Sequence, residues 1–337
     1  MKTALITTTI NVPRVLELYR KLDSEARFFV AGDMKTPHYE TTELCDRIGN
    51  CDFISQLWQT IKNYEHSELI GWNTDSRRNI ALLEALKWGA DLIVSIDDDM
   101  IPQGDWDFAC RFEFPFDGLQ LGARHHWFDA GVFSTPPAPQ RGLPPDVLPV
   151  SGAEHVVDAR IGAAQGIIFG VPDTDAVTAM SKAPRVLGAT DILRNGFVVH
   201  PQAFSVFNSQ FTAFRRELAP AFAQFYNHQG RNTDIFASLL MRRIMREKNL
   251  YTYFGPPMAF HARTSRPLFK DLKAEMWGLE HIEEWAMYLA MATLPDASVT
   301  DASVTDQCRA LTGGCAIFSD EMKACARAWY NDVEKVL

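Results

Sequence analysis

The sequence predicts an α/β protein, built as a doubly wound, parallel sheet flanked by helices and followed by a helical C-terminal segment. Three observations lead to this prediction. Strand-like and helix-like segments alternate over residues 3–96, which is the pattern of such a sheet. The last strand of this series ends on the run Asp97, Asp98 and Asp99, at the edge where these sheets bind ligands. From residue 271 onward the patterning is mostly helical.

The first half of the chain supplies the alternating elements. We expect strand, helix, strand, helix and strand over residues 3–10, 12–22, 26–33, 75–90 and 91–96. In the second helix Asp75 is an N-cap candidate and Gly89 a terminating residue. The strand 91–96 is rich in apolar residues, as expected where both faces are buried.

The second half is less regular. Residues 134–150 are rich in proline and predict a surface loop. Residues 163–172 and 196–218 contain further strands, and residues 233–248 form a strong helix that begins near Asp234. The tandem DASVTDASVT at residues 296–305 is too short for a structural repeat and predicts a flexible connector.

Composition limits the class of protein. The chain has 337 residues, 47% of them hydrophobic, which suits one large domain or one domain with an appendage. A formal net charge of -9, without a basic block, argues against nucleic-acid binding. The six cysteines form no C-x-x-C pair, and neither a signal peptide nor a long apolar run is found. We therefore expect a reduced, cytoplasmic protein that is not inserted in a membrane.

The three aspartates admit two interpretations. An acidic turn could close the strand in solvent, since aspartate is favoured in turns and Pro102 follows. Alternatively, three carboxylates that are even partly buried need a cation, and a hard divalent ion such as Mg²⁺ or Mn²⁺ suits them. The chain has neither a G-x-G-x-x-G motif after its first strand nor a P-loop. The D-x-D formed by Asp97 and Asp99 could instead hold an ion that bridges the phosphates of a nucleotide sugar.

A family resemblance supports the second interpretation. The stretch SRRNIALLEALKWGADLIVSIDDDMIP resembles the nucleotide-sugar-binding core of GT-A glycosyltransferases. More narrowly, the chain resembles the reversibly glycosylated polypeptide family, which includes UDP-arabinopyranose mutases. Four segments carry this likeness, at residues 95–99, 165–176, 208–222 with 230–245, and 260–280. The resemblance implies a GT-A, Rossmann-like mixed sheet in a catalytic domain of residues 1–270, with residues 271–337 as a helical extension.

The resemblance also implies a set of binding residues. The metal ligands would be Asp97, Asp99 and His261, with Mn²⁺ or Mg²⁺ as the ion. Lone histidines are more often structural, so His261 is chosen only because the D-x-D is present. The nucleotide sugar would contact Thr8, Thr9, Asp33, Arg77, Arg78, Asp97, Asp98 and Arg263. Either Arg77 or Arg78 could pair with the phosphates or the base, and a surface salt bridge is the alternative for both.

Two further residues would serve catalysis. Asp234 matches the second acid of the family's Asp-Asp pair, while Thr233 stands where the family has the first. The carboxylate of Asp234 could bind sugar hydroxyls or act as a base, or could merely cap the helix. Arg160 is the nearest counterpart of the arginine that becomes glycosylated in family mutases, although its spacing to residues 165–166 is shorter.

Three functions follow from these residues. The leading hypothesis is a metal-dependent glycosyltransferase that uses a UDP-sugar or a related nucleotide sugar and an unknown acceptor. The second is a UDP-sugar mutase that interconverts pyranose and furanose forms through the glycosylated arginine. The third is a nucleotide-sugar-binding protein without turnover. The proline-rich loop and the helical tail could form the acceptor site or a subunit contact in a homo-oligomer.

Overall fold

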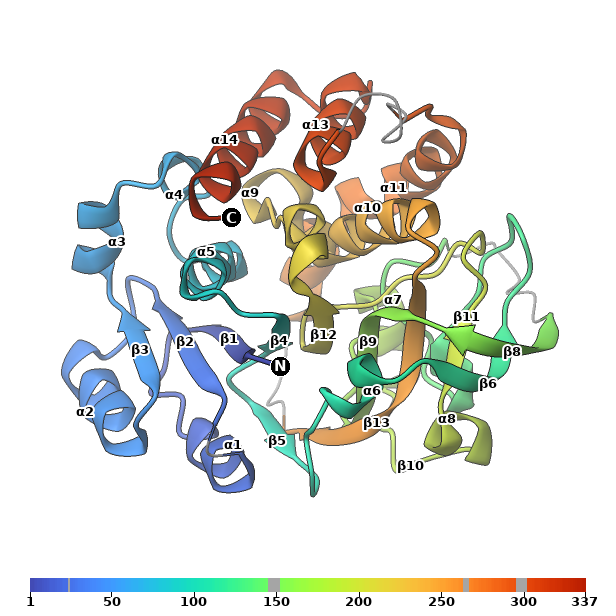
Figure 1. Cartoon of the computed structure of the whole chain (residues 1–337), viewed down its shortest axis with the longest axis horizontal. Helices are drawn as coiled ribbons and strands as arrows, with labels where there is room; N and C mark the ends of the chain where they lie inside the picture. Colours follow the sequence, from blue (N-terminus) through green and yellow to red (C-terminus); the bar gives the residue numbers. More distant parts are fainter. Residues whose placement is uncertain (24, 145–151, 263–266, 295–301) are drawn as a thin grey trace.

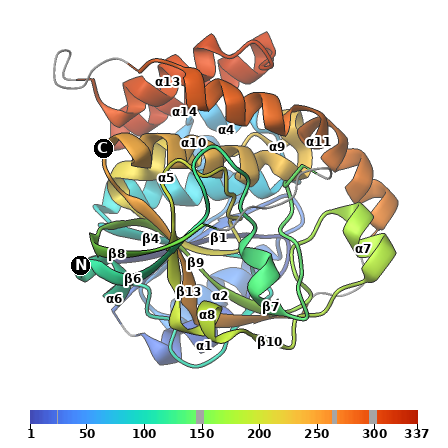
Figure 2. The ribbon, with the colours of Figure 1, turned by 90° about the vertical axis from the view of Figure 1, so that its right-hand side faces the viewer.

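The protein is an α/β structure built on one large mixed sheet. The computed structural model describes residues 1–23, 25–144, 152–262, 267–294 and 302–337. Its main sheet has eleven strands in the order β3-β2-β1-β4-β12-β9-β13-β11-β6-β8, with β5 paired to β13. Helices cover both faces of this sheet, and the C-terminal helices form a further layer on one side (Figures 1 and 2).

The strands of the main sheet are β1 (Thr3–Thr9), β2 (Arg27–Gly32), β3 (Cys51–Ile54), β4 (Leu92–Ile96), β5 (Met100–Pro102), β6 (Phe116–Leu121), β8 (Ala153–Ala159), β9 (Ile161–Gly170), β11 (Phe197–Val199), β12 (Phe211–Arg215) and β13 (Tyr251–His261). A small separate sheet pairs β7 (Ser134–Thr135) with β10 (Gly188–Ala189). The α-helices are α1 (Leu16–Leu22), α2 (His38–Ile48), α3 (Gln56–Lys62), α4 (Glu65–Leu69), α5 (Arg78–Trp88), α6 (Cys110–Glu113), α7 (Ala176–Lys182), α8 (Asp191–Asn195), α9 (Tyr226–Gln229), α10 (Thr233–Glu247), α11 (Leu268–Met291), α13 (Val304–Gly314) and α14 (Asp320–Val336). Short 3₁₀ turns are η1 (Asp75–Arg77), η2 (Ala130–Phe133), η3 (Arg216–Phe222) and η4 (Gly230–Asn232).

The N-terminal half of the sheet is parallel, as predicted. Strands β3, β2, β1 and β4 all run in the same direction. Strand β12 is antiparallel to both β4 and β9, and β13 is parallel to β9. Strands β9 and β13 therefore point the same way as β1, β2, β3 and β4, and the carboxyl ends of these six strands lie at the same edge of the sheet.

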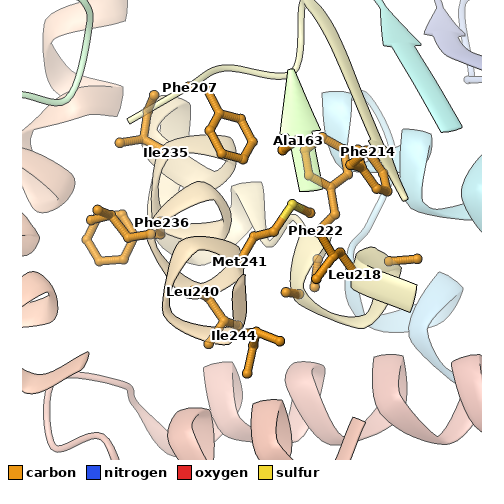
Figure 3. Close-up of a cluster of buried hydrophobic side chains, with 14 of the residues drawn as sticks. Ala163, Phe207, Phe214, Leu218, Phe222, Ile235, Phe236, Leu240, Met241 and Ile244 are labelled. Atoms are coloured by element: carbon orange, nitrogen blue, oxygen red, sulfur yellow. The ribbon is translucent and has the colours of Figure 1, made fainter. Parts of the chain in front are cut away.

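The core fills both faces of the sheet. Every residue of β4 is buried, which explains its nearly continuous apolar run. Leu5 of β1 packs with α1 residues on one face, whereas Ala4 and Ile6 pack with α5 on the other. Figure 3 shows the second cluster around α10, where Met241 points toward Phe222 and Ala163.

Helix α5 differs in one respect from the prediction. It ends at Gly89, which has a φ of 85° in the left-handed region, as the sequence predicts. Its start is different, because Asp75 begins the 3₁₀ turn η1 and no side-chain cap is found there. The carboxylate of Asp75 is thus not used as a helix cap.

The C-terminal helices share the core of the sheet. Ile282 and Trp285 of α11 and Trp329 of α14 are buried in the cluster that contains Ile6 and Leu83. Trp329 Nε1 donates a hydrogen bond of 2.8 Å to the carbonyl of Pro220. These helices lie over α5, α9 and α10 (Figure 1). Helices α11, α13 and α14 therefore pack as part of the main body.

Two segments of the second half correct the predictions. Part of the predicted connector at 296–305 is helical, because Ser303 forms a capping box with Asp306 at the start of α13; residues 295–301 lie outside the described residues. The predicted loop at 134–150 begins with the short strand β7, and its residues 145–150 also lie outside the described part.

Candidate active site

A pocket of about 380 Å³ lies where the carboxyl ends of the parallel strands meet. Thr9 ends β1, Asp33 follows β2, Asp97 follows β4 and His261 ends β13. The residues that line this pocket are Thr8, Thr9, Ile10, Asp33, Asn73, Thr74, Asp75, Arg78, Asp97, Asp98, Asp99 and His261. Most of the residues predicted from the sequence are therefore brought together at one edge of the sheet.

The three aspartates each have a different partner. Asp97 forms an ion pair with the guanidinium of Arg78. Asp98 accepts a hydrogen bond from the hydroxyl of Thr9. Asp99 lies beside His261, with 3.1 Å between Oδ2 and Nε2. Separate partners explain how three adjacent carboxylates fit into one turn, since each charge is met by its own donor.

Asp98 is partly buried beside Thr9. Burial raises its pKa, the hydrogen bond from Thr9 lowers it, and the charges of Asp97 and Asp99 raise it further, so that the net pKa lies above its ordinary value. Thr8 is turned elsewhere, since its hydroxyl donates to the carbonyl of Ala31 at 3.0 Å. Thr9 and Asp98 thus fix each other in the pocket wall.

His261 is held in one orientation. It is buried, and Nδ1 lies 2.7 Å from the carbonyl oxygen of Val171, which can only accept a hydrogen. Nδ1 therefore carries a proton, and Nε2 faces Asp99. Burial alone would lower the pKa of His261, but the hydrogen bond and charge of Asp99, with Asp97 and the Val171 carbonyl, raise it. A histidine oriented by a carbonyl at one nitrogen and facing a carboxylate at the other is also the arrangement of metal-binding histidines.

The predicted metal ligands are only partly assembled. Asp99 and His261 meet, whereas Asp97 is directed to Arg78. Within the described ranges, no group of three or more His, Cys, Asp or Glu side chains is placed to hold a metal ion. Asp99 and His261 would fit Mg²⁺ or Mn²⁺ if substrate phosphates and water completed the coordination. Mg²⁺ is usually bound in this way, with few protein ligands.

Arg78 is the arginine of this pocket. Its guanidinium is buried between Asp97, the carbonyl of Ile96 and Ser209. In the part of the chain that the structure describes, its Nε and the hydroxyl of Thr74 are buried without a hydrogen-bond partner. Unsatisfied buried polar groups are costly, so these atoms suit a polar ligand in the pocket.

Arg77 is not part of the pocket. It is 1% exposed, and its guanidinium donates to Gln59, to Ser67 and to the carbonyl of Gly71. It also stacks on Trp72, with its Cζ 3.6 Å from the ring centre. The structure therefore places Arg78, and not Arg77, in the lining of the pocket, and Arg77 serves the fold.

Asp33 lines the pocket but is already engaged with the backbone. Its carboxylate accepts hydrogen bonds from the amides of Met34, Asn73 and Thr74 at 2.6, 2.7 and 3.0 Å. These bonds hold the loop that precedes η1 against the end of β2. Asp33 thus positions Asn73, Thr74 and, through them, Asp75.

No protein-family model matches the sequence, and no curated protein matches it. Across the described part of the chain, no helix has both the length and the apolar character to cross a membrane.

Asp234 lies behind the pocket in a buried ionic network. It is 5% exposed, and its two oxygens lie 3.0 and 3.1 Å from Nη2 of Arg141. It also accepts hydrogen bonds from the Ser209 amide and hydroxyl and from the Ile235 amide. This explains its place at the start of α10, but a carboxylate whose oxygens are all engaged is poorly suited to act as a base.

The network extends beyond Asp234. Arg141 also binds Asp173, and Arg231 contacts Asp173, Asp271 and Glu275. It joins the proline-rich loop, the segment after β9, and helices α10 and α11. Arg141 is the residue that the sequence analysis missed here, because a single arginine in a loop carries no signal of its distant partners.

The two remaining predicted residues are not brought to the pocket. Arg160 is exposed and precedes β9, whereas the pocket lies beyond the other end of this ten-residue strand, about 30 Å away. The prediction that it is a catalytic neighbour of the nucleotide sugar thus lacks the required proximity. Arg263 lies outside the described residues.

Asp75 is the second residue that the sequence analysis missed. It was assigned as a helix cap, but it lines the pocket with Arg78 and Asp97. Desolvation of the carboxyl and then the charge of Asp234 raise the pKa of Asp75 to about 6, although the residue itself is exposed to solvent. A carboxyl group with such a pKa can exchange a proton near neutral pH.

Proposed function

We propose that this protein is a metal-dependent glycosyltransferase of GT-A type, whose donor is a nucleotide sugar, with UDP-sugars as the first class to test. The observation that carries the proposal is the pairing of Asp99 with His261 in the same pocket as Arg78. In the proposed function, Asp99 and His261 would hold a cation next to the guanidinium of Arg78, and a nucleoside diphosphate needs both. The mixed sheet and the position of the pocket at strand ends support the GT-A assignment.

The donor set gives each residue a defined task. Asp99 and His261 would hold Mg²⁺ or Mn²⁺, which would neutralise the diphosphate as a leaving group. The free Nε–H of Arg78 and the Thr74 hydroxyl can bind phosphate or ribose oxygens, and both are buried without a partner among the described residues. Asp97 keeps the Arg78 guanidinium in place.

Asp75 takes the role that the sequence suggested for Asp234. A general base must reach the acceptor hydroxyl and must have a free oxygen. Asp75 lines the pocket and has a pKa of about 6, whereas Asp234 is held by Arg141 and Ser209. We assign to Asp75 the removal of the acceptor proton, and to Asp234 the positioning of Ser209, whose hydroxyl contacts Arg78.

The test is donor turnover. Purified protein is incubated with a panel of nucleotide sugars and Mn²⁺, with and without EDTA, while released nucleoside diphosphate, isomerised donor and protein mass are followed. We expect release from at least one donor, its loss with EDTA, and a rate about 100-fold lower in Asp99→Asn. Asp46→Asn, an exposed change of the same charge on α2, is the matched control.

The other outcomes separate the alternatives. Release that is unaffected by EDTA and by Asp99→Asn would contradict the metal site. An isomerised donor with sugar-labelled protein would indicate the mutase, for which the distant Arg160 offers no support. Tight UDP binding without any turnover would indicate a nucleotide-sugar-binding protein.

A further inference from the structure

A second pocket lies along α10, away from the strand ends. It has a volume of about 40 Å³ and is bounded by residues 201–204, by one face of α10 and by α11. Three arginines of α10 line it, namely Arg242, Arg243 and Arg246. Arg242 is eight residues, or about 12 Å along the helix, from Asp234, so this pocket is separate from the candidate active site.

Arg242 is a buried cation without a counter-ion. Its side chain donates hydrogen bonds to the Thr252 hydroxyl at 2.6 Å and to the carbonyls of His200 and Ala203 at 3.0 Å each. All three acceptors are neutral, and no salt bridge involves Arg242 within the described ranges. Burial lowers its pKa to about 10, so it stays charged at neutral pH. A buried charge of this kind is costly unless an anion approaches it.

The two neighbouring arginines share one carboxylate. Glu247 forms an ion pair with Arg243 and lies 3.6 Å from Nε of Arg246. The side chain of Arg243 is only 5% exposed. Its Nε is buried and has no hydrogen-bond partner in the part of the chain that is described. With Arg242, the three guanidinium groups and the one carboxylate of Glu247 leave an excess of two positive charges. This excess is local, because the whole chain carries a formal charge of -9.

We propose that this pocket binds the phosphate group of a small phosphorylated metabolite. A phosphate dianion matches the excess of two positive charges, and its oxygens suit the arginine forks. Apolar side chains also line the pocket, namely Leu239 of α10 and Ala286 and Leu289 of α11, and they would adjoin the organic part of the ligand. The inference does not depend on the proposed glycosyl transfer, since none of these residues belongs to that site.

The proposal can be tested with inorganic phosphate as the probe. Calorimetric titration of the wild-type protein is compared with titration of Arg243→Gln, of Arg246→Gln and of the double variant, with chloride at matched ionic strength as the blank. Arg242 is left intact because it ties residues 200–203 to α10. We expect saturable phosphate binding that is about tenfold weaker in each single variant, the effect of losing one charge-assisted hydrogen bond.

Two controls separate this pocket from other sources of binding. Arg309→Gln removes the same charge from α13 and should leave the affinity unchanged. Arg78→Gln alters the candidate active site and should leave this phosphate site intact. Circular dichroism verifies folding, and Arg246→Lys, which keeps the charge but loses the fork, should bind with intermediate affinity. Absence of saturable binding in the wild-type protein, or equal binding in the double variant, would overturn the proposal.

Discussion

At the scale of single residues, the candidate site depends on the side-chain partner of each aspartate that follows β4. Asp97 is directed to Arg78, Asp98 to Thr9 and Asp99 to His261. In the proposed function, this division gives one carboxylate to positioning, one to the pocket wall and one to the binding of a cation. Asp99 keeps a side-chain exposure of 43%, so it can still reach a ligand in the pocket.

The pair of Asp99 and His261 should make stability depend on pH in metal-free protein. The pKa of His261 is raised in the folded state above its ordinary value of about 6.5. A raised pKa in the folded state contributes to the free energy of unfolding. This contribution is fully present below about pH 6.5 and is lost as the pH rises through the folded-state pKa of His261. Urea unfolding in EDTA should therefore show wild-type protein losing stability relative to His261→Gln above about pH 6.5. Parallel curves for the two proteins would contradict this.

The same histidine predicts proton release on metal binding. A metal needs the unprotonated Nε2, so Mn²⁺ must displace the proton that faces Asp99. Apparent Mn²⁺ affinity should rise as the pH is raised from 6 to 8. Calorimetry in two buffers that differ in ionisation enthalpy should detect up to about one proton released. His261→Gln should abolish the difference between the buffers, and a wild-type protein without that difference would refute the assignment.

Substitutions of Asp75 and Asp234 should affect different properties, turnover in the first case and stability in the second. Asp75→Asn should lower turnover by about 100-fold or more, because the base is lost, and should leave the free energy of unfolding within about 0.5 kcal/mol. Asp234→Asn should destabilise the protein by about 3 kcal/mol, because Arg141 loses a buried partner. With saturating Mn²⁺, wild-type turnover should fall below about pH 6. Equal loss of turnover with equal stability in both variants would contradict these roles.

Much of the site could be predicted because it follows strand ends. Asp97, Asp98 and Asp99 close an apolar strand, which is a local signal. The choice between Arg77 and Arg78 could not be made, because adjacent helical residues point about 100° apart and only the packing shows which faces the pocket. Arg141 could not be found, since its partner Asp234 lies 93 residues away.

At the scale of elements, local patterning identified the helices and strands that have a uniform environment. The buried strand β4 and helix α10 match their predicted segments. Strand β13 is not among the predicted strands, and it contains Pro256 and Pro257, which disfavour a regular strand in the middle of a sheet. The register between β13 and β9 shifts between Phe254 and Met258, so the prolines are accommodated at an irregularity and the strand continues to His261.

The start of α13 offers a test at this scale. Ser303, in the second copy of the DASVT tandem, accepts a hydrogen bond from the Asp306 amide at 3.1 Å. Ser303→Ala should lower the free energy of unfolding by about 1 kcal/mol, since it removes the cap. Ser303→Thr keeps the hydroxyl and should be nearly neutral. Denaturant unfolding of the two variants measures the difference, and equal stability of both would show that the cap contributes nothing.

At the scale of the whole molecule, the C-terminal helices belong to the same packed body as the sheet. Trp329 is fully buried, contacts His66 with ring centres 5.3 Å apart, and donates to Pro220. Asp332 accepts a hydrogen bond from the His66 amide at 2.8 Å. The sequence could not show this packing, because helical periodicity does not reveal which surface a helix will cover.

This packing predicts that residues 271–337 cannot be removed without loss of folding. Trp329→Ala should destabilise the protein by about 3–5 kcal/mol through the lost burial and the cavity. Phe269→Ala, at a position that is 76% exposed, should change the stability by less than about 0.5 kcal/mol. A fragment of residues 1–270 should show no cooperative thermal transition. A stable, cooperatively folding fragment would instead establish residues 271–337 as a separate appendage.

The most direct test of the central assignment is UDP affinity with and without metal. Calorimetric titration with UDP is made in Mn²⁺ and in EDTA, for wild-type protein and for Asp99→Asn. If Asp99 and His261 hold an ion that meets the diphosphate, Mn²⁺ should tighten UDP binding to the wild-type protein about tenfold or more, and Asp99→Asn should lose this gain. UDP that binds equally in both conditions, or does not bind at all, would contradict a metal-assisted nucleotide-sugar site.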